Sequence, residues 1–135
     1  MLKYLLDTNI VIYVIKRRPS VVLETFNRQA GLMCVSAITE AELLHGAEKS
    51  QQKERNLAIV DDFLSRLDVL DYGRKAASHY GDIRADLERK GTPIGVNDLH
   101  LAAHARSEGL ILVTNNLREF ERVDGLRLEN WLPSP

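Results

Sequence analysis

The segment LKYLLDTNIVIYVIK, residues 2–16, contains the first strand-to-helix unit of the chain and decides the fold. Its apolar beginning, residues 2–6, is typical of a short buried strand. Residues 9–16 are rich in β-branched side chains, which favour a strand by propensity. We nevertheless predict a helix over 9–16, because Asp7-Thr8-Asn9 is a strong N-cap signal.

Beyond this unit, short apolar runs alternate with helical patterns. Strands are predicted at 32–35, 68–71 and 110–114, with an edge strand at 126–129. Helices are predicted at 19–27 (opened by Pro19), 36–49, 55–67, 73–90, 97–108 and around Phe120. The alternation predicts one α/β domain over residues 1–135, a sandwich with a central, mostly parallel sheet and a loose tail at 132–135.

Composition narrows the function classes. The chain has 135 residues, 44% of them hydrophobic, and a formal net charge of −1, so bulk charge does not indicate nucleic-acid binding. The single cysteine, Cys34, excludes an internal disulfide and fits a reducing cytosol. No apolar stretch approaches the ~20 residues of a membrane helix, and the N-terminus is unlike a signal peptide. We therefore expect a cytoplasmic protein.

Acidic side chains flank the carboxyl ends of the predicted strands. Asp7 follows the first strand, and Glu42 lies in the first turns of the helix after the second. Asp98 opens the helix before the strand at 110–114. Three polar residues follow that strand: Asn115, Asn116 and Glu119. Because ligands in such folds bind beyond the carboxyl ends of the strands, these groups are expected to share one pocket.

Clustered carboxylates suit the hydrolysis of phosphodiesters. Mg²⁺ and Mn²⁺ prefer carboxylate oxygens and water as ligands. Such an ion activates a water molecule and neutralises charge on the phosphoryl oxygens. Carboxylates that repel one another gain most when a cation arrives.

Helix capping is the competing explanation for each acid. Asp7 fits a cap of the following helix, and Asp98 fits a favourable charge at a helix N-terminus. Thr39 and Glu42 fit a capping box, with Glu42 reaching back to the start of its helix. The apolar neighbours of Glu42 indicate partial burial, where an unpaired carboxylate is costly, and so favour a functional role.

Four motifs resemble those of the PIN-domain family. In chain order they are Leu5-Leu6-Asp7-Thr8-Asn9, Ser36-Ala37-Ile38-Thr39-Glu40-Ala41-Glu42-Leu43, Gly91-Thr92-Pro93-Ile94-Gly95-Val96-Asn97-Asp98 and Leu112-Val113-Thr114-Asn115-Asn116-Leu117-Arg118-Glu119-Phe120-Glu121-Arg122-Val123. The likeness runs from Met1 to about Trp131, with the motifs in order. Within the family, the chain is most similar to the VapC toxins of bacterial toxin–antitoxin pairs.

The resemblance implies a PIN-type α/β/α sandwich with Mg²⁺- or Mn²⁺-dependent endoribonuclease activity. By position, it implies a site of Asp7, Glu42 and Asp98, in which Asp7 and Asp98 hold the principal metal. Many family members carry an aspartate where this chain has Asn116, so Glu119 is the alternative fourth acid. The resemblance also implies a VapB-type antitoxin, a homodimer or toxin–antitoxin hetero-oligomer, and an RNA substrate such as the anticodon region of initiator tRNA.

Supporting roles are expected for further side chains. Residues that could hydrogen bond to the metal ligands are Thr8, Asn9, Ser36, Thr114 and Asn116. Candidates for phosphate contacts are Lys16, Arg17, Arg18 and Arg118.

Two alternative functions stay open on the sequence alone. One is another α/β metal phosphohydrolase, since Asp7-Thr8-Asn9 faintly resembles the Asp-x-Asp start of some phosphatases, although Asn9 stands where the second acid is needed. The other is a non-catalytic acidic binding module, in which the acids are helix caps.

Overall fold

The computed structural model of the protein describes residues 1–16 and 20–132. Its elements, in chain order, are β1 (Tyr4–Leu6), α1 (Thr8–Lys16), α2 (Ser20–Arg28), β2 (Met33–Ser36), α3 (Ala37–Glu48), α4 (Lys53–Leu64), β3 (Asp68–Leu70), α5 (Arg74–Arg89), α6 (Val96–Ser107), β4 (Ile111–Val113), α7 (Leu117–Phe120) and β5 (Leu128–Glu129). The predictions for Arg17, Arg18, the helix start at Pro19 and most of the tail at 132–135 lie outside the described residues.

The strands form one five-stranded sheet in the order β3-β2-β1-β4-β5, and every neighbouring pair is parallel. β1 is therefore central, with β2 on one side and β4 on the other. In such sheets, ligands bind beyond the carboxyl ends of neighbouring strands whose connections leave in opposite directions. Asp7 and Thr114, which directly follow β1 and β4, lie at this point.

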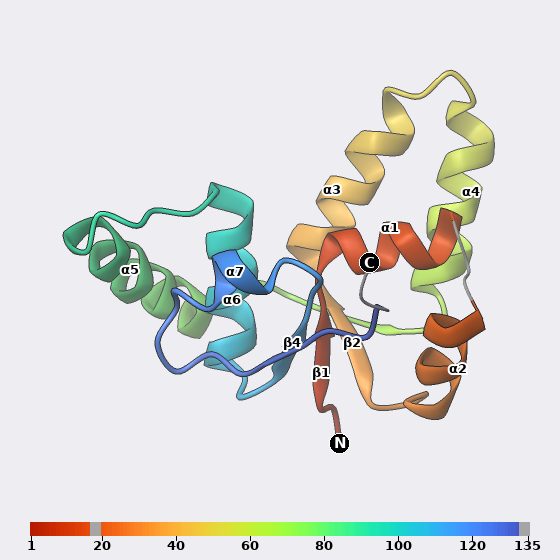
Figure 1. Ribbon diagram of the computed structural model, residues 1–135. Coiled ribbons are helices and arrows are strands. Elements are labelled where there is room, and N and C mark those ends of the chain that lie inside the picture. The colour runs from red at the N-terminus through yellow and green to blue at the C-terminus, as the bar shows by residue number, and fades with distance from the viewer. Residues whose placement is uncertain (17–19, 133–135) are drawn as a thin grey trace.

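Helices cover both faces of the sheet. Alternate strand residues point to opposite faces, so Leu6 and Val35 pack with α1, α3 and α4, whereas Leu5 and Cys34 pack with α5, α6 and α7. Figure 1 shows this division, with α5, α6 and α7 on one side and α1, α3 and α4 on the other. A parallel sheet buried on both faces explains why the three inner strands, β2, β1 and β4, are buried along their whole length rather than at alternate residues.

The first helix forms against its strand propensity. The N–H groups of Ile10 and Val11 donate to the carbonyl of Asp7 at 3.0 and 3.2 Å, which starts α1 directly after β1. Ile10, Val11 and Val14 are buried on its core face. Burial of each such side chain is worth about 1.5–3 kcal/mol, which exceeds the propensity differences of under about 1 kcal/mol.

A glycine turn sets the direction of α6. Gly109 has φ +67°, and the N–H of the next residue, Leu110, donates to the carbonyl of Ala105 at 2.9 Å. This arrangement is a Schellman cap, which ends the helix and returns the chain into β4. α6 therefore runs back along the sheet from the edge where the strands end, and its first turn, with Asp98, lies at that edge.

The α/β sandwich with a central parallel sheet predicted from the sequence is confirmed, and the predicted elements are present within a few residues. Strands are shorter than predicted: residues 2–6 give Tyr4–Leu6, and 110–114 give Ile111–Val113. The prediction of a helix at 55–67 was two to three residues late, since α4 is Lys53–Leu64. Among the described residues, no helix has the length and apolar character needed to cross a membrane.

Candidate active site

Asp7 is buried at the end of the central strand, with 2% of its surface exposed. The Thr114 hydroxyl donates to its Oδ2 at 2.7 Å. Burial raises the pKa of Asp7 above its usual range, and the nearby charge of Glu42 raises it further. Hydrogen bonds from Thr114 and from the backbone at Thr8 and Asn9 offset part of this rise. The chain thus places a carboxylate where its charge is costly unless a cation approaches.

Glu42 is held at both carboxylate oxygens. The Thr8 hydroxyl donates to Oε1 at 2.6 Å, and the Asn97 side-chain amide donates to Oε2 at 3.0 Å. Because the single Thr8 proton goes to Glu42, the Thr39 hydroxyl is the donor in the 2.9 Å contact between the two threonine Oγ1 atoms. Hydrogen bonds to Glu42 thus join α3 to the starts of α1 and α6.

Asp98 and Glu119 have pKa values that shift in opposite directions. Burial, the hydrogen bond to Glu119 and the surrounding negative charges raise the pKa of Asp98 to about 7. Burial alone would raise the pKa of Glu119, but hydrogen bonds from Asp98, Asn116 and the backbone N–H of Gly95 lower it. The Asn116 amide donates to Oε2 at 2.9 Å, and the Gly95 N–H donates to Oε1 at 3.2 Å. The proton therefore lies on Asp98, and Glu119 is the charged member.

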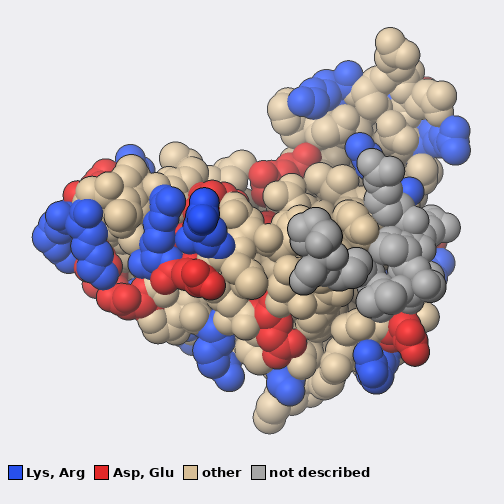
Figure 2. Space-filling view, viewed as in Figure 1, with Lys and Arg blue, Asp and Glu red and all other residues tan. Residues whose placement is uncertain are grey.

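The sequence-predicted acids gather in one place. The charges of Glu119, Asp7 and Glu42 each contribute to the raised pKa of Asp98, which requires these carboxylates to be close together. Figure 2 shows acidic side chains at the base of the notch between the α3–α4 hairpin and the lobe formed by α5, α6 and α7. Glu119 belongs to this cluster, whereas Asn116 acts as its hydrogen-bond donor.

Capping accounts for these acids only in part. The N-cap of α3 is Ser36, whose Oγ accepts from the N–H of Ile38 at 3.0 Å, so the alternative capping box from Thr39 does not form. Glu42 reaches across to neighbouring elements instead. Asp7 does receive backbone N–H groups at the start of α1, so it serves as a cap as well as a member of the cluster.

Neutral groups hold the acids. The ion pairs found among the described residues join side chains elsewhere, and none includes a carboxylate of this cluster. The donors are the hydroxyls of Thr8 and Thr114, the amides of Asn97 and Asn116, and backbone N–H groups. The negative charge of the cluster is therefore left without a bonded cationic side chain.

The donor set fits a divalent cation by chemistry and charge. Carboxylate oxygens are the ligands that Mg²⁺ and Mn²⁺ prefer, and crowding of these groups favours an added cation. Within residues 1–16 and 20–132, no three acidic, histidine or cysteine side chains already form a cage for a metal ion. Oxygens of Glu42 and Glu119 are engaged in hydrogen bonds instead, and the raised pKa of Asp98 means that a metal ion would compete with a proton for this carboxylate.

The predicted supporting residues divide into two groups. Three of them hydrogen bond to the acids: Thr8, Thr114 and Asn116. Asn9 is exposed, and Ser36 caps α3 and bonds to His104 rather than to an acid. Sequence reasoning missed Asn97, although its place directly before Asp98 was a signal. Arg118, the predicted phosphate contact, is exposed directly before Glu119.

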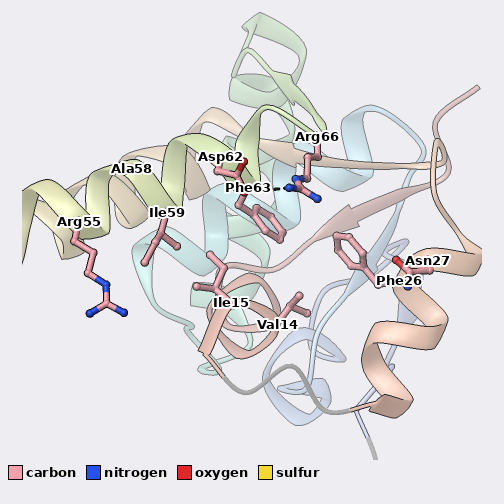
Figure 3. Close-up of a pocket in the computed structure, with 10 residues that line it drawn as sticks. All are labelled: Val14, Ile15, Phe26, Asn27, Arg55, Ala58, Ile59, Asp62, Phe63 and Arg66. Carbon is pink, nitrogen blue, oxygen red and sulfur yellow. Dashed lines mark hydrogen bonds and ion pairs between the residues drawn. The ribbon is translucent and has the colours of Figure 1, made fainter.

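A separate apolar groove lies between α1, α2 and α4. It encloses about 650 Å³ and is lined mainly by apolar side chains, with Phe26 and Phe63 rings 5.8 Å apart. Figure 3 shows Val14 and Ile15 on one wall and Ile59 on another, with Arg55 on the side of Ile59 and Arg66 at the other end, beside Phe63. None of the clustered acids lines this groove, so it is a distinct surface feature.

Comparison with known proteins identifies the family. The PIN domain model matches residues 4–126, and the chain belongs to the PIN-domain family. It is 67% identical to Ribonuclease VapC2 of Haemophilus influenzae over 98% of this chain and all of that protein. It is 60% identical to the tRNA(fMet)-specific endonuclease VapC of Shigella flexneri, over 97% of this chain and 99% of that one. A chain in the crystal structure of DNA-bound VapBC from Salmonella typhimurium superposes with a TM-score of 0.96 at 57% identity, over 98% of this chain and all of that chain.

Proposed function

We propose that this protein is a metal-dependent endoribonuclease of the VapC type, the toxin of a toxin–antitoxin pair. The observation that carries the proposal is the gathering of Asp7, Glu42, Asp98 and Glu119 at the point where β1 and β4 end, held by neutral donors. The high identity to proteins named ribonuclease VapC supports the same activity. The two alternatives, a small-ester phosphohydrolase and a non-catalytic module, have no comparable support.

In the proposed mechanism, Asp7 and Asp98 hold a Mg²⁺ or Mn²⁺ ion, with Glu42 and Glu119 completing the acidic surroundings. When bound, such an ion lowers the pKa of a water molecule and stabilises charge on the scissile phosphate. Thr114 orients Asp7 through the 2.7 Å hydrogen bond, and Asn116 orients Glu119. Fixed outer groups of this kind hold ligands in the geometry that the reaction needs.

Initiator tRNA is the substrate we propose. The supporting observation is the 60% identity, over nearly the whole chain, to a protein named tRNA(fMet)-specific endonuclease. Cleavage of initiator tRNA in its anticodon region would inhibit translation. The cytoplasm, where tRNA is found, is the proposed location.

A VapB-type antitoxin is the proposed partner, in a toxin–antitoxin hetero-oligomer or alongside a toxin homodimer. Support comes from structural relatives that are VapBC complexes, including the one from Salmonella typhimurium.

The test is cleavage of purified initiator tRNA, with elongator tRNA and ribosomal RNA as competitors. The parent protein should cut with Mg²⁺ or Mn²⁺ and stop when EDTA is added. Asp7→Asn should lower the rate by about 10³-fold or more, because a metal ligand contributes several kcal/mol to the transition state. Asp61→Asn, an exposed carboxylate on α4, is the matched control and should cut at the parent rate.

Folding must be checked alongside. Burial raises the pKa of Asp7, so the charged form is disfavoured in the folded state and the neutral Asp7→Asn variant should melt no lower than the parent without metal. Full cleavage in EDTA, or parental activity of a folded Asp7→Asn variant, would overturn the proposal.

A further inference from the structure

The two donors that hold Glu42 are chain neighbours of the other acids. Thr8, which bonds Oε1 at 2.6 Å, directly follows Asp7. Asn97, which bonds Oε2 at 3.0 Å, directly precedes Asp98. Since each donor is one residue from an acid, the two hydrogen bonds fix Glu42 relative to both Asp7 and Asp98. Three elements that are far apart in the sequence meet at this carboxylate.

The two donors differ in their surroundings. Thr8 is buried, with 6% of its surface exposed, and is also bonded to Thr39, so it contributes to the packing of α1 against α3. Asn97 is exposed in the first turn of α6. An exposed neutral hydrogen bond adds little to folding stability, so removal of the Asn97 amide should leave the fold intact.

Neutral donors also suit the electrostatics. Hydrogen bonds favour the charged form of a carboxylate without introducing a positive charge. The Asn97 amide therefore holds Glu42 near Asp98, at the proposed cation site, and leaves the net charge of the cluster unchanged. A lysine or arginine there would neutralise the cluster.

We infer that Asn97 is a positioning residue, whose amide fixes the carboxylate of Glu42 in the arrangement that RNA cleavage requires. The inference rests on the proposed function, since it assigns a role within the same site. Asn97 acts through Glu42 and not by its own contact with RNA. Loss of an outer hydrogen-bonding partner at such a site typically lowers activity about 10–100-fold.

The first test compares steady-state cleavage by the parent, Asn97→Ala and Asn97→Asp. Asn97→Ala should lower kcat about 10–100-fold with KM within about 2-fold, because ligand geometry and not RNA affinity is affected. Asn97→Asp, which matches the shape but places a negative charge beside Glu42, should be at least as slow. The control is Asn130→Ala, which removes an exposed asparagine at the end of β5 and should keep the parent rate.

A double-mutant cycle separates positioning from direct contact with RNA. In the Glu42→Ala background, the additional Asn97→Ala change should cost less than about 2-fold, because no acceptor for the Asn97 amide remains at residue 42. An equal cost in both backgrounds would overturn the inference, since Asn97 would then act without Glu42. Parental kcat for Asn97→Ala would also overturn it.

A spectroscopic measurement gives a readout without metal or RNA. In the metal-free protein, the side-chain amide resonances of Asn97 should move when Glu42 is replaced by Ala, which removes the acceptor, whereas those of Asn130 should not. Unmoved Asn97 resonances would contradict the hydrogen bond itself. A parent protein that cuts no RNA overturns the proposed function and this inference together, whereas an active parent that tolerates Asn97→Ala overturns the inference alone.

Discussion

The Ser36 side chain both caps helix α3 and hydrogen bonds to the buried His104. Its replacement by alanine should therefore lower the stability of the fold by an unusually large amount for a single substitution. Its Oγ accepts from the N–H of Ile38 at 3.0 Å and lies 2.7 Å from Nδ1 of His104. Burial lowers the pKa of His104, so the imidazole is neutral near pH 7. We assign the Ser36 hydroxyl as the donor to Nδ1, because its oxygen already accepts from the backbone.

The Ser36→Ala substitution should lower the free energy of unfolding in two ways. Loss of an N-cap side chain costs about 1 kcal/mol. His104 is 1% exposed, so its Nδ1 would be left buried without a donor, at about 1–3 kcal/mol. The free energy of unfolding should therefore fall by about 2–4 kcal/mol, with a melting temperature lower by roughly 10 °C. Urea denaturation measures the change as a shift of midpoint at constant slope.

The matched control is Ser36→Ala in a His104→Leu background. Leucine removes the imidazole, including its Nε2 atom, which is buried without a partner among the described residues. In that background Ser36→Ala should cost only the cap, about 1 kcal/mol. The same cost in both backgrounds, or a total below about 1 kcal/mol, would refute the coupling of Ser36 to His104.

Three further predictions concern His104, Asp98 and Arg118. Because burial lowers the pKa of His104 below its usual 6.5, the unfolded chain binds more protons than the folded chain at acid pH, and the free energy of unfolding should fall as pH drops below 6.5. In a pH series of urea melts, the free energy of unfolding of His104→Leu should fall less steeply than that of the parent. An equal slope would contradict the pKa shift. The pKa of Asp98 is raised from 3.8 to about 7, so the metal-free folded state binds a proton that the unfolded chain has lost, and the free energy of unfolding should decline as pH rises from about 4 to about 7. Asp98→Asn should remove this decline. A parental pH profile for Asp98→Asn would count against the raised pKa. Arg118→Ala should weaken RNA binding and reduce its salt slope by about 1, whereas Arg66→Ala, in the apolar groove, should not; equal effects of the two would argue against phosphate contact by Arg118.

The acids of the site could be found from the sequence because their placement depends on chain direction. Asp7 follows a strand, and Glu42 and Asp98 lie in early turns of helices, so a parallel sheet brings all three to one edge. No knowledge of side-chain packing is needed for this step. Local signals also predicted where two of the helices end, at Gly91 after α5 and at Gly109 after α6.

The groups that position the acids could not be found in this way. Asn97 and His104 bond to Glu42 and Ser36, which are 55 and 68 residues away along the chain. Which side of α6 faces α3 cannot be read from periodicity, because α6 is buried nearly all round. Its buried residues are Leu99, Leu101, Ala102, Ala103, His104 and Ala105. A helix without a polar face gives no signal for the few polar contacts that cross its interface.

Packing also explains the late prediction for α4. The helix at 55–67 was predicted from apolar side chains at helical spacing, Leu57, Val60, Leu64 and Leu67, although the helix ends at Leu64. Leu67 still packs against the core, and its N–H donates to the carbonyl of Leu64 at 3.3 Å in a turn. The periodicity of apolar residues indicates which positions are buried, and burial continues for one turn beyond the end of the helix. The helix start at Lys53 was missed because no side-chain cap marks it.

The hydrogen-bond partners of the clustered acids indicate what the cluster does, because none of the bonded partners that the structure describes is an arginine or a lysine. A buried carboxylate that served only to stabilise the fold would gain most from an arginine or lysine, since a charged hydrogen bond is worth about twice a neutral one. Here the bonded partners of the acids are hydroxyls, amides and backbone N–H groups, and the pKa of Asp98 is raised to about 7. Such partners fix the oxygens without adding positive charge, although the nearby charge of Arg122 favours ionised Glu119. Retention of this unfavourable charge is explained if a cation that is not part of the chain completes the site, as the proposed nuclease requires.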